Sequence, residues 1–263
     1  MPDADALSIT QIRKHLRTNT IGSGIEILDT VDSTNTYLKR LAAAGCPDGY
    51  VVIADAQTVG RGRFGKSFAS PRGGVYMSLL LKPGVLINEI PFITICLAVA
   101  VSRAIDGVCG LDTSVKWVND VYVGDKKISG ILAESVVSGG VGFVVAGIGV
   151  NTGAIPDGFG DIATSVYNET GKKGFRNALI AALMNETEEV YKNLTDARHR
   201  RAVLDEYVSK LFILTKRVRI TTESESFDAT VTDVAETGEL LVRDEDGREQ
   251  RVLSGEIEWR GLE

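Results

Sequence analysis

The sequence predicts an α+β fold in which helices cover a mixed β-sheet and a small β-barrel-like domain follows at the C-terminus. Apolar runs with strand character, such as Val75–Leu81 and Val141–Val150, are joined by tight turns and interspersed with segments of helical periodicity. From about Thr215 the chain changes to short alternating strands separated by turn residues. We therefore predict two domains, a main domain at residues 1–212 and a small domain at residues 213–263.

Capping residues and glycines mark the first elements. Ser8 and Gln11 form an S-x-x-Q capping box before apolar residues at helical spacing, which predicts a short helix ended by Gly22. Ile25–Leu28 has the pattern of a strand. One helix is too little for a helix-turn-helix domain, which needs at least two packed helices.

The next helix is predicted to start at Asp32–Asn35, because these residue types prefer helix N-caps, and to stop at Gly45. Pro91–Val108 is apolar nearly all round and is expected to be a buried helix. Further strands are predicted at Val51–Ala54, Ser114–Val118 and Val121–Val123. A turn at Gly124-Asp125-Lys126 follows, and the remainder of Val121–Ser138 is predicted to be another strand. Gly139-Gly140 is expected to form the next turn. Further helices are predicted at Phe175–Leu194 and Ala202–Leu211, and C-terminal strands at Arg217–Ile220, Phe227–Val231, Glu239–Val242 and Gln250–Leu253.

Composition limits the classes of partner. The 263 residues carry a net charge of −6 and the pI is about 5.2, which argues against general nucleic-acid binding because such domains are usually basic. A local cationic loop can still bind a nucleotide. His15 and His199 are the only histidines, so we expect no histidine-based metal cluster.

The N-terminus and the cysteines favour a cytoplasmic protein. The first ten residues lack a basic start and an apolar core, so they do not form a signal peptide. The longest apolar run, Ile90–Ala100, is too short to span a bilayer. Three cysteines without C-x-x-C spacing, Cys46, Cys96 and Cys109, are expected to be free thiols in a reducing compartment.

One loop stands out at Gln57–Gly74. It contains no acidic residue and mixes five glycines with four cations, Arg61, Arg63, Lys66 and Arg72. The glycines allow close approach of the backbone to a ligand, and the cations suit phosphate or carboxylate. We expect this loop to connect two strands and to wrap an anionic ligand.

Two nucleotide motifs fit this loop by letters: G-x-G-x-x-G, and the P-loop pattern G-x-x-x-x-G-K-S ending at Ser67. Both require a helix directly after the loop, because the helix N-terminus carries part of the phosphate binding. Pro71 and two following glycines break such a helix. We therefore expect neither motif to be functional in that sense.

Two further polar stretches admit two interpretations each. Asp32–Asn35 is either a plain helix cap or a helix start whose hydroxyl, amide and N–H groups bind a polar ligand. Lys127 is either a surface lysine beside a turn or a site residue. Alternation with Ile128 predicts that Lys127 and Ser129 share one face of their strand.

Taken in order, five segments resemble the biotin protein ligases, and the resemblance runs from about Leu7 to the C-terminus. The segments are Asp32-Ser33-Thr34-Asn35, Gly60-Arg61-Gly62-Arg63, Lys116-Trp117-Val118-Asn119-Asp120, Lys127-Ile128-Ser129-Gly130-Ile131-Leu132-Ala133-Glu134 and Gly147-Ile148-Gly149-Val150-Asn151. The resemblance implies a class II synthetase-like biotin/lipoate ligase fold with a C-terminal SH3-like barrel. It also implies a homodimer formed by joining sheets.

The implied activity has two steps. Biotin and MgATP give biotinyl-5′-AMP and pyrophosphate, and a lysine of a biotin carboxyl carrier protein or domain then takes the biotinyl group, releasing AMP. ATP and biotin are substrates, Mg²⁺ accompanies the nucleotide, and no metal-binding residue is assigned. Carboxylate attack on the α-phosphate brings several negative charges together, which suits a positioned cation array.

The resemblance also implies roles for individual residues. Lys127 and Arg63 are the catalytic residues, both acting electrostatically rather than as bases. The biotin side comprises Ser33, Thr34, Asn35, Gln57, Gly60, Arg61, Gly62, Lys127, Gly130, Gly147 and Gly149. The nucleotide side comprises Arg63, Lys66, Phe68, Asn119 and Asn151.

The sequence departs from the family pattern at a few places. Relatives often have Pro at the position of Val118 and Trp at that of Phe68, and Phe offers less area for stacking on a nucleotide base. Bifunctional relatives carry an N-terminal winged helix, whereas fewer than thirty-five residues precede Asp32 here. We therefore expect a ligase without DNA binding. The alternatives are a lipoate or octanoate ligase or transferase, a P-loop ATPase, and a non-catalytic ligand sensor or DNA-binding protein.

Overall fold

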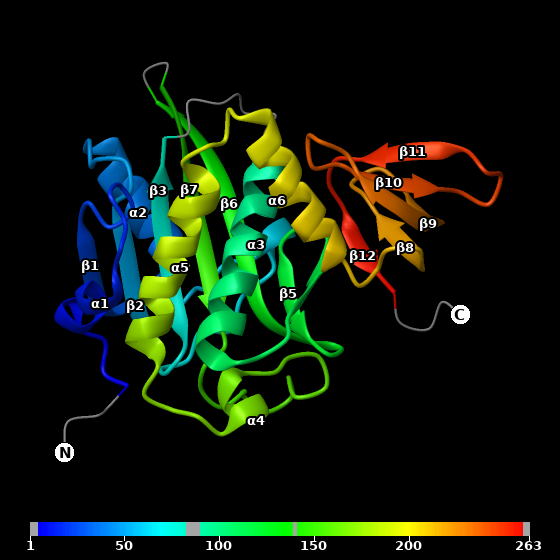
Figure 1. Cartoon of the computed structure of the whole chain (residues 1–263). Helices are drawn as coiled ribbons and strands as arrows, with labels where there is room; N and C mark the ends of the chain where they lie inside the picture. Colours follow the sequence, from blue (N-terminus) through cyan, green and yellow to red (C-terminus); the bar gives the residue numbers. More distant parts are fainter. Residues whose placement is uncertain (1–4, 83–89, 139–140, 260–263) are drawn as a thin grey trace.

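A computed structural model describes residues 5–82, 90–138 and 141–259, which form two β-sheets with helices on both faces of the larger one (Figure 1). The larger sheet has the strand order β1-β2-β3-β7-β6-β5-β4. β1 and β2 are parallel and all other neighbours are antiparallel, so the sheet is mixed, as predicted. Its strands are β1 (Ile25–Val31), β2 (Val51–Gln57), β3 (Val75–Leu81), β4 (Ser114–Lys116), β5 (Asp120–Val123), β6 (Lys126–Ser138) and β7 (Val141–Val150).

Three helices cover one face of this sheet, and Figure 1 shows them side by side: α3 (Ile90–Cys109), α5 (Arg176–Tyr191) and α6 (Ala197–Ser209). α1 (Ile9–His15) packs against α5. α3 extends beyond the run Ile90–Ala100 that was judged too short, and by length and composition the whole helix could cross a membrane. However, 78% of its most apolar window is buried inside the fold, as in the core helix of a globular domain.

The opposite face carries α2 (Thr34–Ala43), whose cap, Ser33, lies within the predicted start at Asp32–Asn35. Leu38 of this helix packs into a small apolar cluster with Val52, Leu80 and Val145. Beyond Val145 the same face of β7 carries Gly147 and Gly149, because side chains alternate along a strand. The apolar cover therefore gives way to bare backbone beyond the N-terminus of α2.

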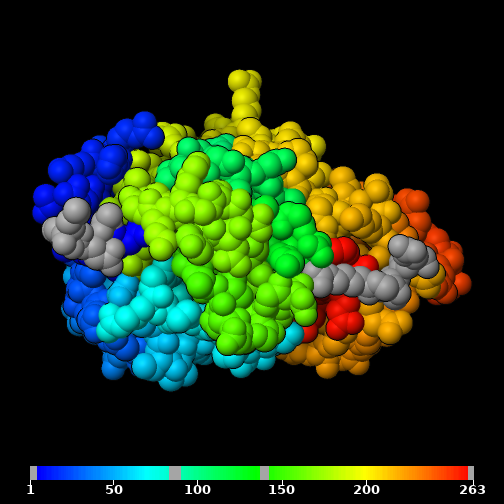
Figure 2. Space-filling model, turned by 90° about the horizontal axis from the view of Figure 1, so that it is seen from below, coloured from blue at the N-terminus to red at the C-terminus, as the bar shows by residue number. Residues whose placement is uncertain are grey.

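The C-terminal residues form a five-stranded antiparallel sheet in the order β11-β10-β9-β8-β12, which agrees with an SH3-like domain. Its strands are β8 (Arg217–Thr221), β9 (Ser226–Val234), β10 (Leu240–Arg243), β11 (Glu249–Val252) and β12 (Glu256–Glu258). The sheet is tied to the main domain by Trp117, whose Nε1 donates to the carbonyl of Gly238 at 2.9 Å. Figure 2 shows this domain, orange to red, at the opposite end of the molecule from the N-terminal segments.

Some boundaries differ from the predictions. α1 ends at His15 rather than near Gly22, because the carboxylate of Glu188 on α5 accepts the backbone N–H groups of residues 19–21 and holds them outside a helix. α4 (Val166–Thr170) and β12 were not predicted, since five and three residues are too few to show a periodic pattern. The turn expected at Gly139-Gly140 lies outside the described residues.

Candidate active site between the sheet and the C-terminal domain

A pocket of about 330 Å³ lies between the α2 face of the sheet, the Gln57–Gly74 loop and the C-terminal sheet. It brings together most of the residues that the sequence motifs singled out. The predicted residues among its lining are Ser33, Thr34, Asn35, Gln57, Arg61, Gly62, Arg63, Lys66, Phe68, Asn119, Lys127, Gly130, Gly147 and Gly149. Gly60 and Asn151 do not line this pocket.

The floor of the pocket has no side chains of its own because three glycines meet there, and Asn35 and Phe68 pack against two of them. Gly130 of β6 pairs with Gly149 of β7, and Gly147 lies two residues further along the same face. A Cβ at Gly147 would lie 2.3 Å from Asn35 Oδ1, and one at Gly149 would lie 2.5 Å from the ring of Phe68. Both distances are too short for real side chains, so these positions require glycine.

The N-terminus of α2 forms one wall, and its polar groups are largely occupied by one another. Asn35 donates to Leu132 O and to Glu134 Oε2, and its Oδ1 lies 2.6 Å from the hydroxyl of Ser78. Gln57 Oε1 accepts from the backbone N–H and the hydroxyl of Thr34. This internal bonding fixes the wall before a ligand arrives and leaves Ser33 as the hydroxyl with the fewest partners.

Ser78 was missed by sequence reasoning although it is completely buried beneath this wall. Apart from Tyr76, it is the one residue with a hydroxyl inside the apolar strand Val75–Leu81. A lone hydroxyl at a core position needs a hydrogen-bond partner. That signal was available in the sequence, but the partners, Thr34 and Asn35, are visible only in the fold.

The loop connects β2 to β3 and contains only a three-residue 3₁₀ turn at Arg63–Gly65, so the predicted absence of a helix is confirmed. Its tip folds back on itself: the N–H of Gly62 donates to Lys66 O, and that of Phe68 donates to Gly60 O. A Cβ at Gly60 would lie 2.3 Å from Phe68 O, so Gly60 permits this hairpin-like closure. Phe64 at the tip has a left-handed backbone, with φ of 53°.

Three loop cations face the pocket, and each is held by different partners. Arg61 lies 3.5 Å from Glu134 of β6. Arg63 donates to Asn119 Oδ1 at 3.0 Å and to Ser254 Oγ at 3.3 Å.

The third cation is Lys66, whose Nζ lies 2.7 Å from Glu256 Oε2 on β12. The fourth loop cation, Arg72, turns away from this pocket, so the four cations do not form one cluster. The loop is therefore tied to both domains.

The cation beside the floor glycines is Lys127, because a Cβ at Gly130 would lie 3.1 Å from its Nζ. Its Nζ lies 2.7 Å from Asp120 Oδ1 and 5.9 Å from the centre of the Phe68 ring. Burial lowers the pKa of Arg63 below its ordinary value, and Asp120 offsets part of this shift. Arginine still stays protonated at neutral pH. The pocket thus offers fixed positive charge above a bare floor.

A β-bulge brings Lys127 to the floor. Val121 pairs with Ser129 whereas Tyr122 pairs with Lys127, so Ile128 is an extra residue in β6. Lys127 therefore shares a face with Gly130, and Ser129 points to the other face, where its hydroxyl donates to Gly149 O. The predicted common face for Lys127 and Ser129 was wrong, because the bulge shifts the alternation by one residue.

A second pocket of about 190 Å³ lies across Phe68 and Lys127 from the first. It contains the predicted nucleotide residue Asn151, whose Nδ2 donates to Thr164 O. Sequence reasoning missed its other walls, Ile155, Phe159 and Ile162. Phe159 and Ile162 are large apolar side chains left exposed at 43% and 55%, which is a common property of ligand pockets.

Neither cysteine chemistry nor a protein-built metal site contributes to these pockets. Cys46, Cys96 and Cys109 are free, as expected, and burial raises the pKa of Cys96 to about 12 and that of Cys109 to about 11. Within the described part of the chain, no three His, Cys, Asp or Glu side chains are grouped so that they could hold a metal ion.

Comparison with known proteins assigns this arrangement to a class. Residues 27–151 match the family described as "Biotin/lipoate A/B protein ligase family". This stretch contains most of the motif residues of the first pocket. Residues 213–260 match "Biotin protein ligase C terminal domain". The fold and the pocket thus define a protein of the biotin and lipoate ligase class.

Individual relatives narrow this class. The biotin protein ligase of Aquifex aeolicus in complex with biotin and ATP has a TM-score of 0.78 and 31% identity, covering 90% of this chain and 98% of that chain. The biotin–[acetyl-CoA-carboxylase] ligase of Mycobacterium tuberculosis is 28% identical over 98% of both chains. The chain belongs to the biotin protein ligase family.

The bifunctional ligase/repressor BirA of Bacillus subtilis is 36% identical over 193 residues. This match covers 71% of the present chain and 59% of the Bacillus protein, which is less than two thirds of that protein.

Proposed function

We propose that this protein is an ATP-dependent ligase that activates biotin as biotinyl-5′-AMP and transfers it to a specific lysine of a biotin carboxyl carrier protein. The observation that carries the proposal is the bare glycine floor with Lys127 and Arg63 beside it, at the junction of two pockets. The Aquifex relative, described in complex with biotin and ATP, supports both substrates. The two pockets provide separate places for an acid and a nucleotide base.

In the first step a biotin carboxylate oxygen attacks the α-phosphorus of ATP, and pyrophosphate leaves. The fused ring of biotin lies in the first pocket, between the α2 wall and the ring of Phe68 that covers Gly149. The adenine lies in the second pocket beyond Phe68. Lys127 then stands where the carboxylate meets the α-phosphate, and Arg63 holds the phosphates. In the structure Lys127 pairs with Asp120. A short movement of the flexible Lys127 side chain would bring its ammonium group from Asp120 to these anions.

In the second step the carrier lysine attacks the acyl carbon of biotinyl-5′-AMP, forming an amide and releasing AMP. The positive charges stabilise the negative charge that develops on the phosphate oxygens. Mg²⁺ arrives with ATP. When bound, it would supply positive charge that neutralises part of the charge on the phosphate oxygens.

Biotin-dependent exchange of labelled pyrophosphate into ATP tests the first step without a carrier protein. We expect exchange with biotin and none with lipoate. Exchange with lipoate alone would show that the substrate is lipoate rather than biotin. Exchange with neither acid, in folded protein, would contradict the proposal.

The P-loop alternative is disfavoured by geometry. Residues 66–74 lead into β3 without a helix, and Lys66 pairs with Glu256 on the C-terminal sheet. A P-loop lysine would instead be essential for phosphate contact. Lys66→Ala should therefore retain adenylation that Lys127→Ala loses, and the reverse result would restore the P-loop interpretation.

We further propose a homodimer in which the sheets of two copies join through β1. β1 bonds only to β2 within its sheet, whereas the other edge strand, β4, is covered by residues 210–212 through backbone hydrogen bonds to Val115. Analytical ultracentrifugation with and without biotin and ATP tests this. A monomer at every concentration would reject the dimer.

The remaining proposals concern location and partners. Three free cysteines suit the reducing cytoplasm. The acceptor is a carrier domain, and no DNA partner is proposed for this acidic chain. Sequence-specific binding of a DNA duplex at physiological salt, measured by fluorescence anisotropy, would contradict the last point.

A further inference from the structure

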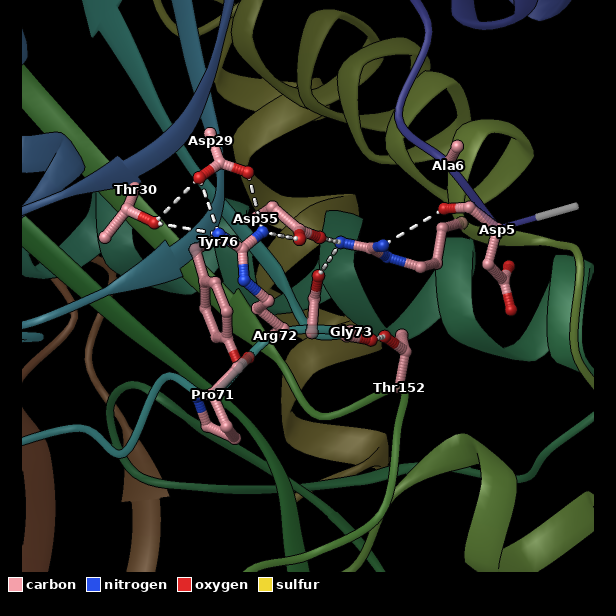
Figure 3. Close-up of polar contacts among 12 residues, drawn as sticks. Asp5, Ala6, Asp29, Thr30, Asp55, Pro71, Arg72, Gly73, Tyr76 and Thr152 are labelled. Carbon is pink, nitrogen blue, oxygen red and sulfur yellow. Dashed lines mark hydrogen bonds and ion pairs between the residues drawn. The ribbon is translucent and has the colours of Figure 1, made fainter. Parts of the chain in front are cut away.

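The fourth loop cation, Arg72, turns away from the first pocket but lies among the residues that line the second. It is at the centre of an ion cluster on β1 and β2 (Figure 3). Its Nη1 lies 2.6 Å from Asp29 Oδ1 and 2.8 Å from Asp55 Oδ2. Its Nη2 lies 2.5 Å from Asp29 Oδ2 and 3.3 Å from Thr30 Oγ1. The guanidinium thus forms a bidentate ion pair with Asp29, an arrangement that adds geometric specificity to the interaction.

A second arginine extends the cluster inward. Arg176, the first residue of α5, has only 5% of its side chain exposed, and its Nη2 lies 2.7 Å from Asp55 Oδ1. The same Nη2 donates to Gly74 O at 2.6 Å. Asp55 therefore links the exposed Arg72 to the buried Arg176, and the cluster joins β1, β2, α5 and the end of the loop.

The loop residues around Arg72 are held at three backbone carbonyls. We call residues 70–74 the exit stem. Pro71 O accepts from the hydroxyl of Tyr76 at 2.8 Å, and Gly73 O accepts from Thr152 at 2.5 Å (Figure 3). With Gly74 O on Arg176, three carbonyls of the exit stem each receive a side-chain donor.

The exit stem leads directly to the candidate active site. Tyr76, which holds Pro71, meets the ring of Phe68 edge-on, with ring centres 6.4 Å apart. Phe68 in turn covers Gly149 and lies beneath Lys127. Ser70 of the exit stem accepts from Gln57 Nε2. Displacement of the exit stem therefore displaces the ring that separates the two pockets.

We propose that Arg72 is a positioning residue for the nucleotide side of the site, acting through the exit stem on Phe68. This inference rests on the proposed ligase function. Arg72 and Asp29 are themselves 57% and 77% exposed, and exposed ion pairs contribute little to folding. Loss of Arg72 should therefore alter the placement of the loop rather than unfold the protein.

The test compares Arg72→Ala with Arg72→Lys in pyrophosphate exchange, measuring KM for ATP and for biotin separately. Small misplacements in a site cost up to ~10²-fold. We expect Arg72→Ala to raise KM for ATP about tenfold while KM for biotin and the melting temperature stay nearly unchanged. Arg72→Lys, which keeps the charge but not the two-nitrogen grip, should recover part of the loss.

Two further variants sharpen the test. Arg201→Ala removes a similarly exposed arginine–aspartate pair on α6, with Asp205, and should leave both KM values unchanged. Asp29→Asn should mimic Arg72→Ala, and the double variant should be no worse than the single one.

Three outcomes would overturn the inference: unchanged kinetics in Arg72→Ala, an equal rise of both KM values with a lower melting temperature, or full additivity of the two substitutions. Absence of exchange in the wild-type protein would instead contradict the ligase function itself, so the two failures are distinguishable.

Discussion

At the scale of single residues, the glycine floor depends on what surrounds each missing side chain. The Asn35 amide beneath Gly147 is fixed by Leu132, Glu134 and Ser78, so it cannot move aside. At Gly130 a Cβ would meet the flexible end of Lys127 at 3.1 Å, which can shift. The glycines of the floor therefore differ in how well they tolerate an added side chain.

This difference predicts unequal effects of alanine on biotin binding. Overpacking a rigid site costs about 1–3 kcal/mol, so Gly147→Ala should raise the biotin Kd about tenfold or more. Gly130→Ala should raise it less. Isothermal titration calorimetry with biotin alone checks both, and wild-type affinity in Gly147→Ala would contradict the assignment of the floor.

Neighbouring lysines provide a matched pair for the charge at the floor. Lys127→Ala should lower the rate of adenylation by ~10²–10³-fold, as for the loss of one transition-state contact. The free energy of unfolding of the protein without biotin should stay unchanged. Lys126, whose Nζ donates to Gly160 O at the surface, is the control, and Lys126→Ala should react normally. Pyrophosphate exchange measures both, and equal rates would remove Lys127 from the mechanism.

At the scale of elements, Glu134 of β6 joins α2 to the loop. It lies 2.7 Å from Lys39, accepts from Asn35 at 2.8 Å and attracts Arg61. Burial raises its pKa, but hydrogen bonds from Lys39 and Asn35 outweigh this, so the pKa falls below its ordinary value of 4.5. The ionised form is therefore favoured by folding.

This pKa shift gives a pH-dependent prediction. A carboxylate with a lowered folded-state pKa stabilises the fold above its unfolded pKa, and the contribution is lost as the pH falls through the folded pKa. Wild type should exceed Glu134→Gln in free energy of unfolding at neutral pH, and the difference should shrink below about pH 4.5. Urea unfolding at pH 7 and pH 3.5 measures this. A difference independent of pH would contradict it.

The helices and strands also show how much of the fold was predictable from the sequence. Periodicity and capping predicted the helices starting at Ile9 and Thr34, the buried helix α3 and every strand of the larger sheet. Such signals are local. The bulge at Ile128 was not predictable, because it depends on the pairing of β6 with β5 rather than on the sequence of β6 alone.

Long-range partners explain what was missed in the candidate site. The sequence motifs identified the glycines of the floor and most of the cations near it. They could not show that Arg72 forms ion pairs with Asp29 and Asp55. The apolar walls at Phe159 and Ile162 lie in an irregular segment without periodicity. Charge and apolarity are readable in a sequence, whereas their spatial partners are not.

At the scale of the whole molecule, the C-terminal sheet closes the first pocket with residues 255–258. Lys66 reaches Glu256, Arg63 reaches Ser254, and Lys116 Nζ donates to Ile257 O at 3.5 Å. The site therefore requires both sheets. The predicted boundary at residues 212 and 213 stays a prediction.

A double-mutant cycle on Lys66 and Glu256 measures this connection. The pair is partly exposed, so its coupling in stability should be only about 0.2–1 kcal/mol. We expect Glu256→Gln and Lys66→Ala each to raise KM for ATP by a few fold, with no further rise in the double variant. Fully additive effects on KM would show that the two side chains act separately.

The position of Phe68 has a consequence for inhibitor design. Its ring covers Gly149 between the two pockets, with the Lys127 ammonium 5.9 Å from the ring centre. A compound that joins a biotin-like head to an adenosine-like tail must pass this constriction. A flat, acidic linker that pairs with Lys127 should fit there better than a bulky or cationic one.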